Sequence, residues 1–203
     1  MTIEKGSAYG TPGPLPDHGV VVASDAEAAA VVRDARRLGH APPPLGLIGG
    51  DLCRTLGGPG REDRLRGPDA TTFAVDLGVV LLDGRVDVFV AHLVARRRAW
   101  TGPFAVVMNA EWLGPLDLGP RAHPGDGLLD VTEGRLGLRE RLQARRRART
   151  GSHLPHPGLR TSRRRAVDLS FPGGVPVRLD GEERGRAAEI MVHLEPDALT
   201  VVV

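Results

Sequence analysis

The chain has 203 residues and a formal net charge of +2, and 41% of its residues are hydrophobic. These values exclude a disordered chain and allow one large or two small domains with a buried core. The single cysteine, Cys53, excludes an intrachain disulfide and fits a reducing compartment. No segment approaches the roughly 18 apolar residues of a membrane helix, and the N-terminus has no apolar leader, so we expect a cytoplasmic protein.

The first 70 residues alternate between strand and helix signals. Residues 1–18 are rich in glycine and proline and are expected to form a loose N-terminal segment. A short apolar strand over 19–23 precedes a helix over 24–39, which begins with a serine and an aspartate that can cap it. A second strand over 45–48 leads into a short helix bracketed by glycines. Residues 19–70 are therefore predicted to form a fragment of a parallel α/β layer.

From residue 71 onward, β-type segments alternate with turn signals. Two Asp-Gly pairs are hairpin signals, Asp83-Gly84 and Asp180-Gly181. A basic helix is expected at about 136–149. Residues 71–203 are predicted to form a largely antiparallel β-sandwich, or a closed sheet, with that helix inserted. The expected fold is thus a small α/β part plus a larger antiparallel β-sandwich domain with an inserted helix.

An arginine block lies between Arg139 and Arg165, where ten arginines accompany a single acid, Glu140. Such a block is most often a solvated face, and the alternative is an anionic partner. Leu136, Leu138 and Leu142 accompany the arginines, which is a weak form of the pattern that binds an anionic membrane surface peripherally. No nucleic-acid-binding motif and no interleaved aromatic residues accompany the block, so nucleic acid is the least favoured partner.

Four segments, in chain order, resemble the diacylglycerol kinase and bacterial lipid kinase (sphingosine kinase-like) family. The most specific are "DGLLDV" at 126–131 and "LDGE" at 179–182, with the asparagine of "VVMN" upstream. The others are "VVVASDAEAAAVV" followed by "PLGLIGGDLCRTLG", and "VDLGVV". The resemblance covers about residues 19–203. It implies that residues 19–70 are a truncated α/β remnant of a nucleotide-binding domain, that residues 71–203 are a lipid-kinase-like β-sandwich domain with an inserted helix, and that an active site lies in the cleft between them.

Both phosphate-side loops depart from the family pattern. The family has a GGDGT loop after its first matching strand, where this chain keeps Asp25 and replaces the flanking glycines. The second loop is shortened to Gly49-Gly50-Asp51. Side chains in a phosphate cradle obstruct the phosphate, which disfavours ATP binding. The cofactor-binding positions that the resemblance implies are Asp25, Gly49, Gly50, Arg54 and Asn109.

Three acidic residues carry the catalytic interpretation. Phosphoryl transfer to a lipid hydroxyl needs a metal ion and a carboxylate that accepts the proton. The resemblance implies that Asp51 faces the metal and the nucleotide, and that Glu182 is the base, supported by Asp180. The alternative is that "LDGE" is an exposed hairpin turn without a catalytic role.

A structural Mg²⁺ site is implied at Asp126. Its ligands would be the Asp126 carboxylate, the carbonyl groups of His123 and Leu128, and water molecules. The alternative is that Asp126-Gly127 is a plain turn at the start of a strand.

Three functions remain open. The favoured hypothesis is a lipid kinase-like protein that binds a lipid or another small ligand without catalysis, because its phosphate-binding loops are degraded. The first alternative is an active ATP- and Mg-dependent lipid kinase. The second is a homodimer or partner-binding protein, since the shortened α/β part should leave an open sheet edge.

Overall fold

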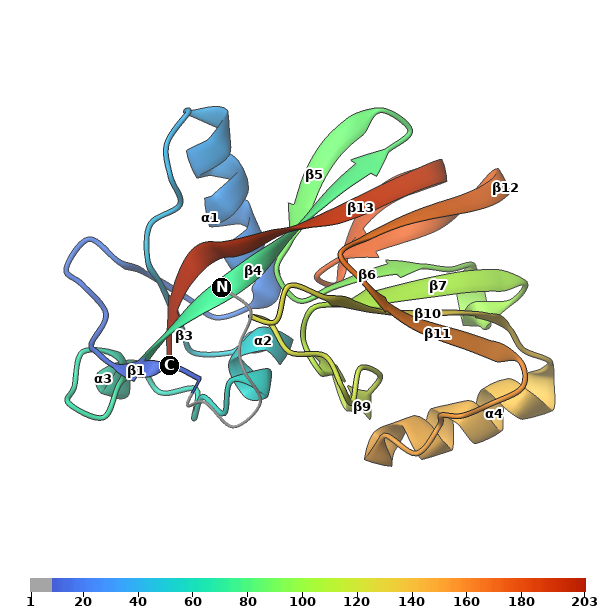
Figure 1. Cartoon of the computed structure of the whole chain (residues 1–203), viewed down its shortest axis with the longest axis horizontal. Coiled ribbons are helices and arrows are strands. Elements are labelled where there is room, and N and C mark those ends of the chain that lie inside the picture. The colour runs from blue at the N-terminus through green and yellow to red at the C-terminus, as the bar shows by residue number, and fades with distance from the viewer. Residues whose placement is uncertain (1–8) are drawn as a thin grey trace.

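The structure is a computed structural model that describes residues 9–203 (Figure 1). Eleven strands of the described residues form one continuous sheet, and β8 (Trp112–Leu113) and β9 (Leu116–Asp117) form a separate hairpin. The strands of the sheet are β1 (Thr11–Pro12), β2 (Val20–Val22), β3 (Leu45–Leu47), β4 (Thr71–Leu82), β5 (Arg85–Phe89), β6 (His92–Ala95), β7 (Pro103–Met108), β10 (Leu129–Arg135), β11 (Leu159–Arg164), β12 (Ala166–Leu179) and β13 (Glu182–Val202). The helices are α1 (Asp25–Arg37), α2 (Gly50–Thr55), α3 (Glu62–Leu65) and α4 (Leu138–Arg147), with 3₁₀ turns η1 (Arg98–Trp100) and η2 (Ala148–Thr150).

The described part of the N-terminal segment is packed, in contrast to the loose segment expected there. β1 pairs with β4, with Thr11 opposite Thr72. Leu15 is buried against Leu65 of α3, and its N–H donates to the Leu65 carbonyl at 2.7 Å. Residues 1–8 of that prediction lie outside the described residues. The buried Leu15 therefore anchors the N-terminal segment, although the glycine and proline content of this segment predicts a loop.

The predicted α/β part forms as expected. The Ser24 hydroxyl accepts the Glu27 N–H at 3.2 Å and so caps α1, whose last turn carries two arginines. The apolar face of α1, with Ala28, Ala29 and Val32, is buried in a core that includes residues of β3 and α2. β2 and β3 pair in parallel. Helix α1 and helix α2 lie at the same end of the molecule in Figure 1.

The last strand, β13, joins the α/β part to the rest of the sheet. It pairs in antiparallel fashion with β12 and β4, and its end pairs in parallel with β3, with Val201 opposite Leu45. Residues of β4, β5, β12 and β13 share a second buried core with residues of β6, β7 and β10. The long sheet thus folds over on itself as a β-sandwich, and the predicted fold class is confirmed.

Both predicted Asp-Gly hairpins form, with Asp83 at φ 46° and Asp180 at φ 50°, each followed by a glycine that also has positive φ. The predicted basic helix is α4 continued by η2, and it lies on the outside of the sandwich near β11 (Figure 1). Over residues 9–203, no helix is long and apolar enough to cross a membrane.

Candidate functional site

A pocket of about 380 Å³ lies where the α/β part meets the sandwich. Its acidic and imidazole side chains are Asp25 from the first residue of α1, Asp51 from α2, His92 from β6 and Asp180 from the β12–β13 turn. Gly50 and Gly114 also line the pocket. Three residues that the sequence singled out, Asp25, Asp51 and Asp180, are therefore brought together.

Asp25 caps the N-terminus of α2 instead of leaving it open. Its two carboxylate oxygens accept the N–H groups of Asp51 at 2.6 Å and Leu52 at 3.1 Å. The glycines before them permit this close approach, because a Cβ at Gly50 would overlap the Asp25 carboxylate and one at Gly49 would overlap the Ala23 carbonyl. Burial raises the pKa of Asp25, although both N–H groups lower it.

Asp51 and His92 form a hydrogen-bonded pair next to Asp25. The His92 Nε2 lies 3.0 Å from the Asp51 Oδ2, and the Gly114 N–H donates to both oxygens of Asp51. Burial acts to raise the pKa of Asp51, but hydrogen bonds from His92 and Gly114 outweigh it and lower that pKa. Burial acts to lower the pKa of His92, but the Asp51 hydrogen bond and the charges of Asp180, Asp51 and Asp25 raise it.

The carboxylate of Asp180 closes the back of the pocket. It accepts three consecutive backbone N–H groups, from Val90 at 2.8 Å, Ala91 at 2.9 Å and His92 at 3.0 Å. Burial raises the pKa of Asp180 to about 6, and the charge of His92 acts in the opposite direction. Asp180 thus holds the backbone of the strand that presents the imidazole to the pocket.

Glu182, the expected base, does not join this group. Its side chain is about half exposed, pairs with Arg184 at 2.6 Å and lies 3.7 Å from Arg33 of α1. Glu182 follows the Asp180-Gly181 turn, and its carboxylate lies outside the pocket wall. Asp180 thus lies in the pocket wall and Glu182 lies outside it, although the resemblance implied that both serve the same catalytic step.

Arg54 and Asn109 serve the architecture around the pocket. The Arg54 guanidinium stacks on Trp112 with its carbon 3.4 Å from the ring centroid, and it donates to the Gly114 carbonyl at 3.0 Å. It thereby holds the β8–β9 hairpin against α2. The amide of Asn109 is fully buried and donates to the carbonyls of Asp76 and Val90. Since the Val90 N–H binds Asp180, Asn109 positions the same backbone from its other side.

The predicted metal position at Asp126 has an arginine beside it. One oxygen of Asp126 accepts the Leu128 N–H at 3.0 Å, and the other pairs with Arg163. The Asp126 N–H donates to the His123 carbonyl at 3.3 Å, which closes a turn. Arg163 also contacts Asp130 at 3.2 Å. The Arg163 guanidinium therefore neutralises the carboxylates of Asp126 and Asp130. A Mg²⁺ ion would have to displace this guanidinium, so the residues present do not fit a metal. The Mg²⁺ site stays a prediction.

His92 is the residue that the sequence interpretation missed. It stands alone between the apolar runs "VFVA" and "LVA", and only 3% of it is exposed. A lone polar residue inside a buried strand was the available signal, since such a group needs partners brought from elsewhere in the fold.

An α/β part joined to an antiparallel β-sandwich, with carboxylates meeting at their junction, defines a kinase-like two-part architecture. The chain belongs to the family of YegS C-terminal NAD kinase β-sandwich-like domains, whose family model matches residues 79–203, more than half of the chain. This match confirms the predicted relationship to the diacylglycerol kinase-like lipid kinases.

Solved structures agree with this assignment at the level of the fold. Two structures of a protein provisionally assigned as a diacylglycerol kinase from Bacillus anthracis str. Sterne are similar, with a TM-score of 0.66 and 15% identity, over 91% of this chain and 77% of theirs. A crystal structure of a diacylglycerol kinase from the same organism gives a TM-score of 0.64 at 15% identity, over 91% and 75%. At this identity the similarity concerns the fold alone. No protein of curated function matches the sequence.

Proposed function

We propose that this protein is a lipid kinase-like protein that binds a ligand at the Asp25–Asp180 pocket and does not transfer phosphate from ATP. One observation carries the proposal. The N–H groups at the start of α2, which in a phosphate cradle would point at the ligand, are taken by the Asp25 carboxylate. The loop before α1 is closed in the same way, because the Ala23 N–H binds Glu27 and the Glu27 N–H binds Ser24.

The charge of the pocket supports the same proposal. Asp25, Asp51 and Asp180 surround a single imidazole, and no arginine of residues 9–203 forms an ion pair with any of them. A polyphosphate would therefore meet carboxylates where a kinase offers N–H groups and cations. Glu182, held by Arg184 and Arg33, is also poorly placed to accept a proton in this pocket. A neutral or cationic ligand fits these charges better.

We expect Mg-ATP and Mg-ADP to leave the melting temperature of the purified chain unchanged up to millimolar concentration. A ligand at a hundred times its Kd would add about 3 kcal/mol of stability, which for a chain of this size raises Tm by about 5–10 °C. Differential scanning fluorimetry measures the shift, and transfer of labelled phosphate to diacylglycerol or sphingoid bases in micelles measures activity. A saturable shift that disappears in Asp51→Ala, or any phosphate transfer above the rate of that variant, would support the active kinase instead.

A second proposal concerns the membrane surface, and one observation favours it. Helix α4 buries none of its side chains, and Leu138 and Leu142, one turn apart, are 67% and 60% exposed. At helical spacing, Arg145 and Arg141 flank this pair on one side and Arg139 and Arg146 on the other. Two leucines edged by arginines fit the boundary between lipid headgroups and acyl chains of an anionic membrane.

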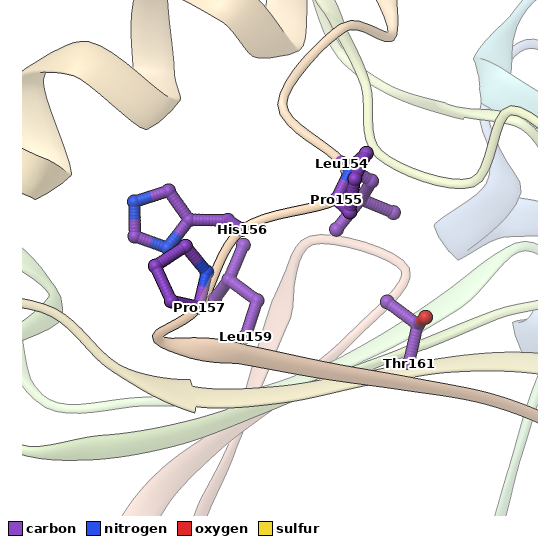
Figure 2. A pocket seen from close by; sticks show the side chains of 6 residues that line it. All are labelled: Leu154, Pro155, His156, Pro157, Leu159 and Thr161. Carbon is purple, nitrogen blue, oxygen red and sulfur yellow. The ribbon is translucent and has the colours of Figure 1, made fainter.

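A small apolar pocket lies in the segment that follows α4 and η2. Figure 2 shows it between the loop after η2 and β11, with a volume of about 340 Å³. Leu159 of its wall and Ala144 of α4 pack against the same buried cluster, which ties the pocket segment to the helix. We propose that the helix and the pocket segment rest on the bilayer, which would bring a lipid ligand to the protein.

Sedimentation with vesicles tests the membrane proposal. We expect binding to phosphatidylglycerol vesicles and not to phosphatidylcholine vesicles, weakened by salt. Reversing Arg145 and Arg146 to Glu should weaken binding by more than about thirtyfold, because each arginine near an anionic surface contributes about 1 kcal/mol and the glutamates add repulsion. Leu142→Ser should weaken it as well. Matched controls are Arg64→Glu and Leu38→Ser, which change exposed residues on other helices. Equal loss in the controls, or equal binding to both vesicles, would refute the proposal.

We also propose a homodimer, because one edge of the sheet, at β2, is unpaired among the described residues. Among the described residues β2 pairs only with β3, so its other edge presents unpaired backbone groups. A second copy or a partner protein that adds a strand there would satisfy them.

A further inference from the structure

We propose that Asp25, Asp51 and His92 form a binding site for a divalent transition-metal ion of the Zn²⁺ type. One candidate ligand atom of each residue lies within 4.8 Å of the other two. Two carboxylates and one imidazole are a common ligand set for such ions, and the nitrogen donor favours Zn²⁺ over Mg²⁺. The site does not depend on whether the protein transfers phosphate.

Both carboxylates are held in place by the backbone and keep lone pairs for a metal. Each oxygen of Asp25 accepts one N–H, and the Gly114 N–H fixes Asp51 from the opposite side. A carboxylate has about four acceptor positions, so these bonds leave room for one metal–oxygen bond each. Such outer hydrogen bonds orient metal ligands in known sites.

His92 supplies an observation independent of the carboxylates. Only 3% of the residue is exposed, and it forms part of the pocket wall. Its Nε2 faces Asp51, while its Nδ1 is buried without a hydrogen-bond partner among residues 9–203. The nitrogen that lies beside Asp51 is Nε2, and it is therefore the atom that would bind the ion together with the two carboxylates. The Asp180 carboxylate fixes the backbone of His92 and therefore the position of the ring.

Charge and access also favour a cation. Three carboxylates converge on one imidazole, and residues 9–203 place no arginine in an ion pair with them. The Asp51 side chain is 19% exposed, so an ion can reach the site from solvent. The pocket of about 380 Å³ leaves space for a water ligand at a fourth position.

Isothermal titration calorimetry of the untagged full-length chain, stripped with a chelator, tests this site with ZnCl₂ as the probe. We expect one Zn²⁺ per chain, and a Co²⁺-loaded protein with the visible absorption of a four-coordinate site. Asp51→Asn and His92→Gln should each weaken Zn²⁺ binding by about tenfold or more. Mg²⁺ at the same concentration should not displace Zn²⁺.

The control variants remove one carboxylate and one imidazole elsewhere. Asp34→Asn and His193→Gln are exposed positions and should leave the Zn²⁺ affinity unchanged. Should His92→Gln fail to fold, as judged by circular dichroism, the partly exposed Asp51→Asn decides the outcome. Absence of saturable Zn²⁺ binding, unchanged affinity in Asp51→Asn, or an equal loss in the control variants would overturn the proposal. A phosphate-transfer activity would contradict the proposed function but leave this site intact.

Discussion

Asp180→Ala is expected to lower the free energy of unfolding by about 3–5 kcal/mol, because three buried N–H groups lose their acceptor at a cost of about 1–3 kcal/mol each. The three groups belong to Val90, Ala91 and His92, at the start of the strand that carries the imidazole. Urea denaturation followed by circular dichroism measures the change. The His92 ring should also move from its native position in this variant, which NMR would detect as altered chemical shifts of the ring.

The second Asp-Gly hairpin provides a matched control. Asp83 has a positive φ of 46° like that of Asp180, and its carboxylate also accepts backbone N–H groups, from Ala188 and Glu189. Asp83 is exposed, so water replaces its hydrogen bonds when the side chain is removed. Asp83→Ala introduces the same backbone strain as Asp180→Ala but should lower the free energy of unfolding by less. Equal losses in the two variants would mean that the turn conformation, and not the buried hydrogen bonds, stabilises this region.

The contribution of Asp180 to stability is expected to fall as the pH rises from about 4 to about 6, the reverse of ordinary acid denaturation. The folded protein protonates Asp180 at about pH 6, whereas the usual value is 3.8. Between these values the folded state holds a proton that the unfolded state has released. The free energy of unfolding therefore falls as the pH rises through this window, by up to about 3 kcal/mol.

His92 extends the trend to higher pH. Its pKa is raised from 6.5, so above that pH the folded state retains a proton that the unfolded state releases, and stability falls again as the pH rises through the folded pKa. Asp51 and His153 have lowered pKa values and act in the opposite direction, Asp51 below its usual value of 3.8 and His153 below its usual value of 6.5. Denaturation midpoints at several pH values measure the trend. Asp180→Asn should flatten the stability profile between about pH 4 and pH 6, and a profile that this substitution leaves unchanged in that window would contradict the assignment.

Local signals predicted the elements that carry the site. Ser24 before an apolar helix, Asp-Gly pairs between strands and an arginine-rich helix all form as expected, because caps, turns and helices depend on residues close in the chain. The family resemblance also led to the three aspartates of the pocket. What each aspartate does in the structure, however, depends on its contacts with residues that are far away in the chain.

Long-range pairing explains what the sequence could not indicate. Asp126 meets Arg163 because β10 and β11 pair in a register that places Asp130 opposite Arg163, across the connection that contains α4. Glu182 finds Arg33 of α1, which is far away in the chain. His92 gains its partners only when β6 and α2 come together. None of these partnerships is set by spacing or periodicity.

The strand β13 connects the two buried cores. Its first half contributes Ile190, Val192 and Leu194 to the sandwich, and its end contributes Leu199 and Val201 to the core beneath α1. Between them the pairing with β4 shifts register, and the Asp197 N–H binds Asp76. The two parts therefore share a structural element and should unfold as one cooperative unit, so the carboxylates of the pocket are held at a junction that cannot hinge open as it does between separately folded domains.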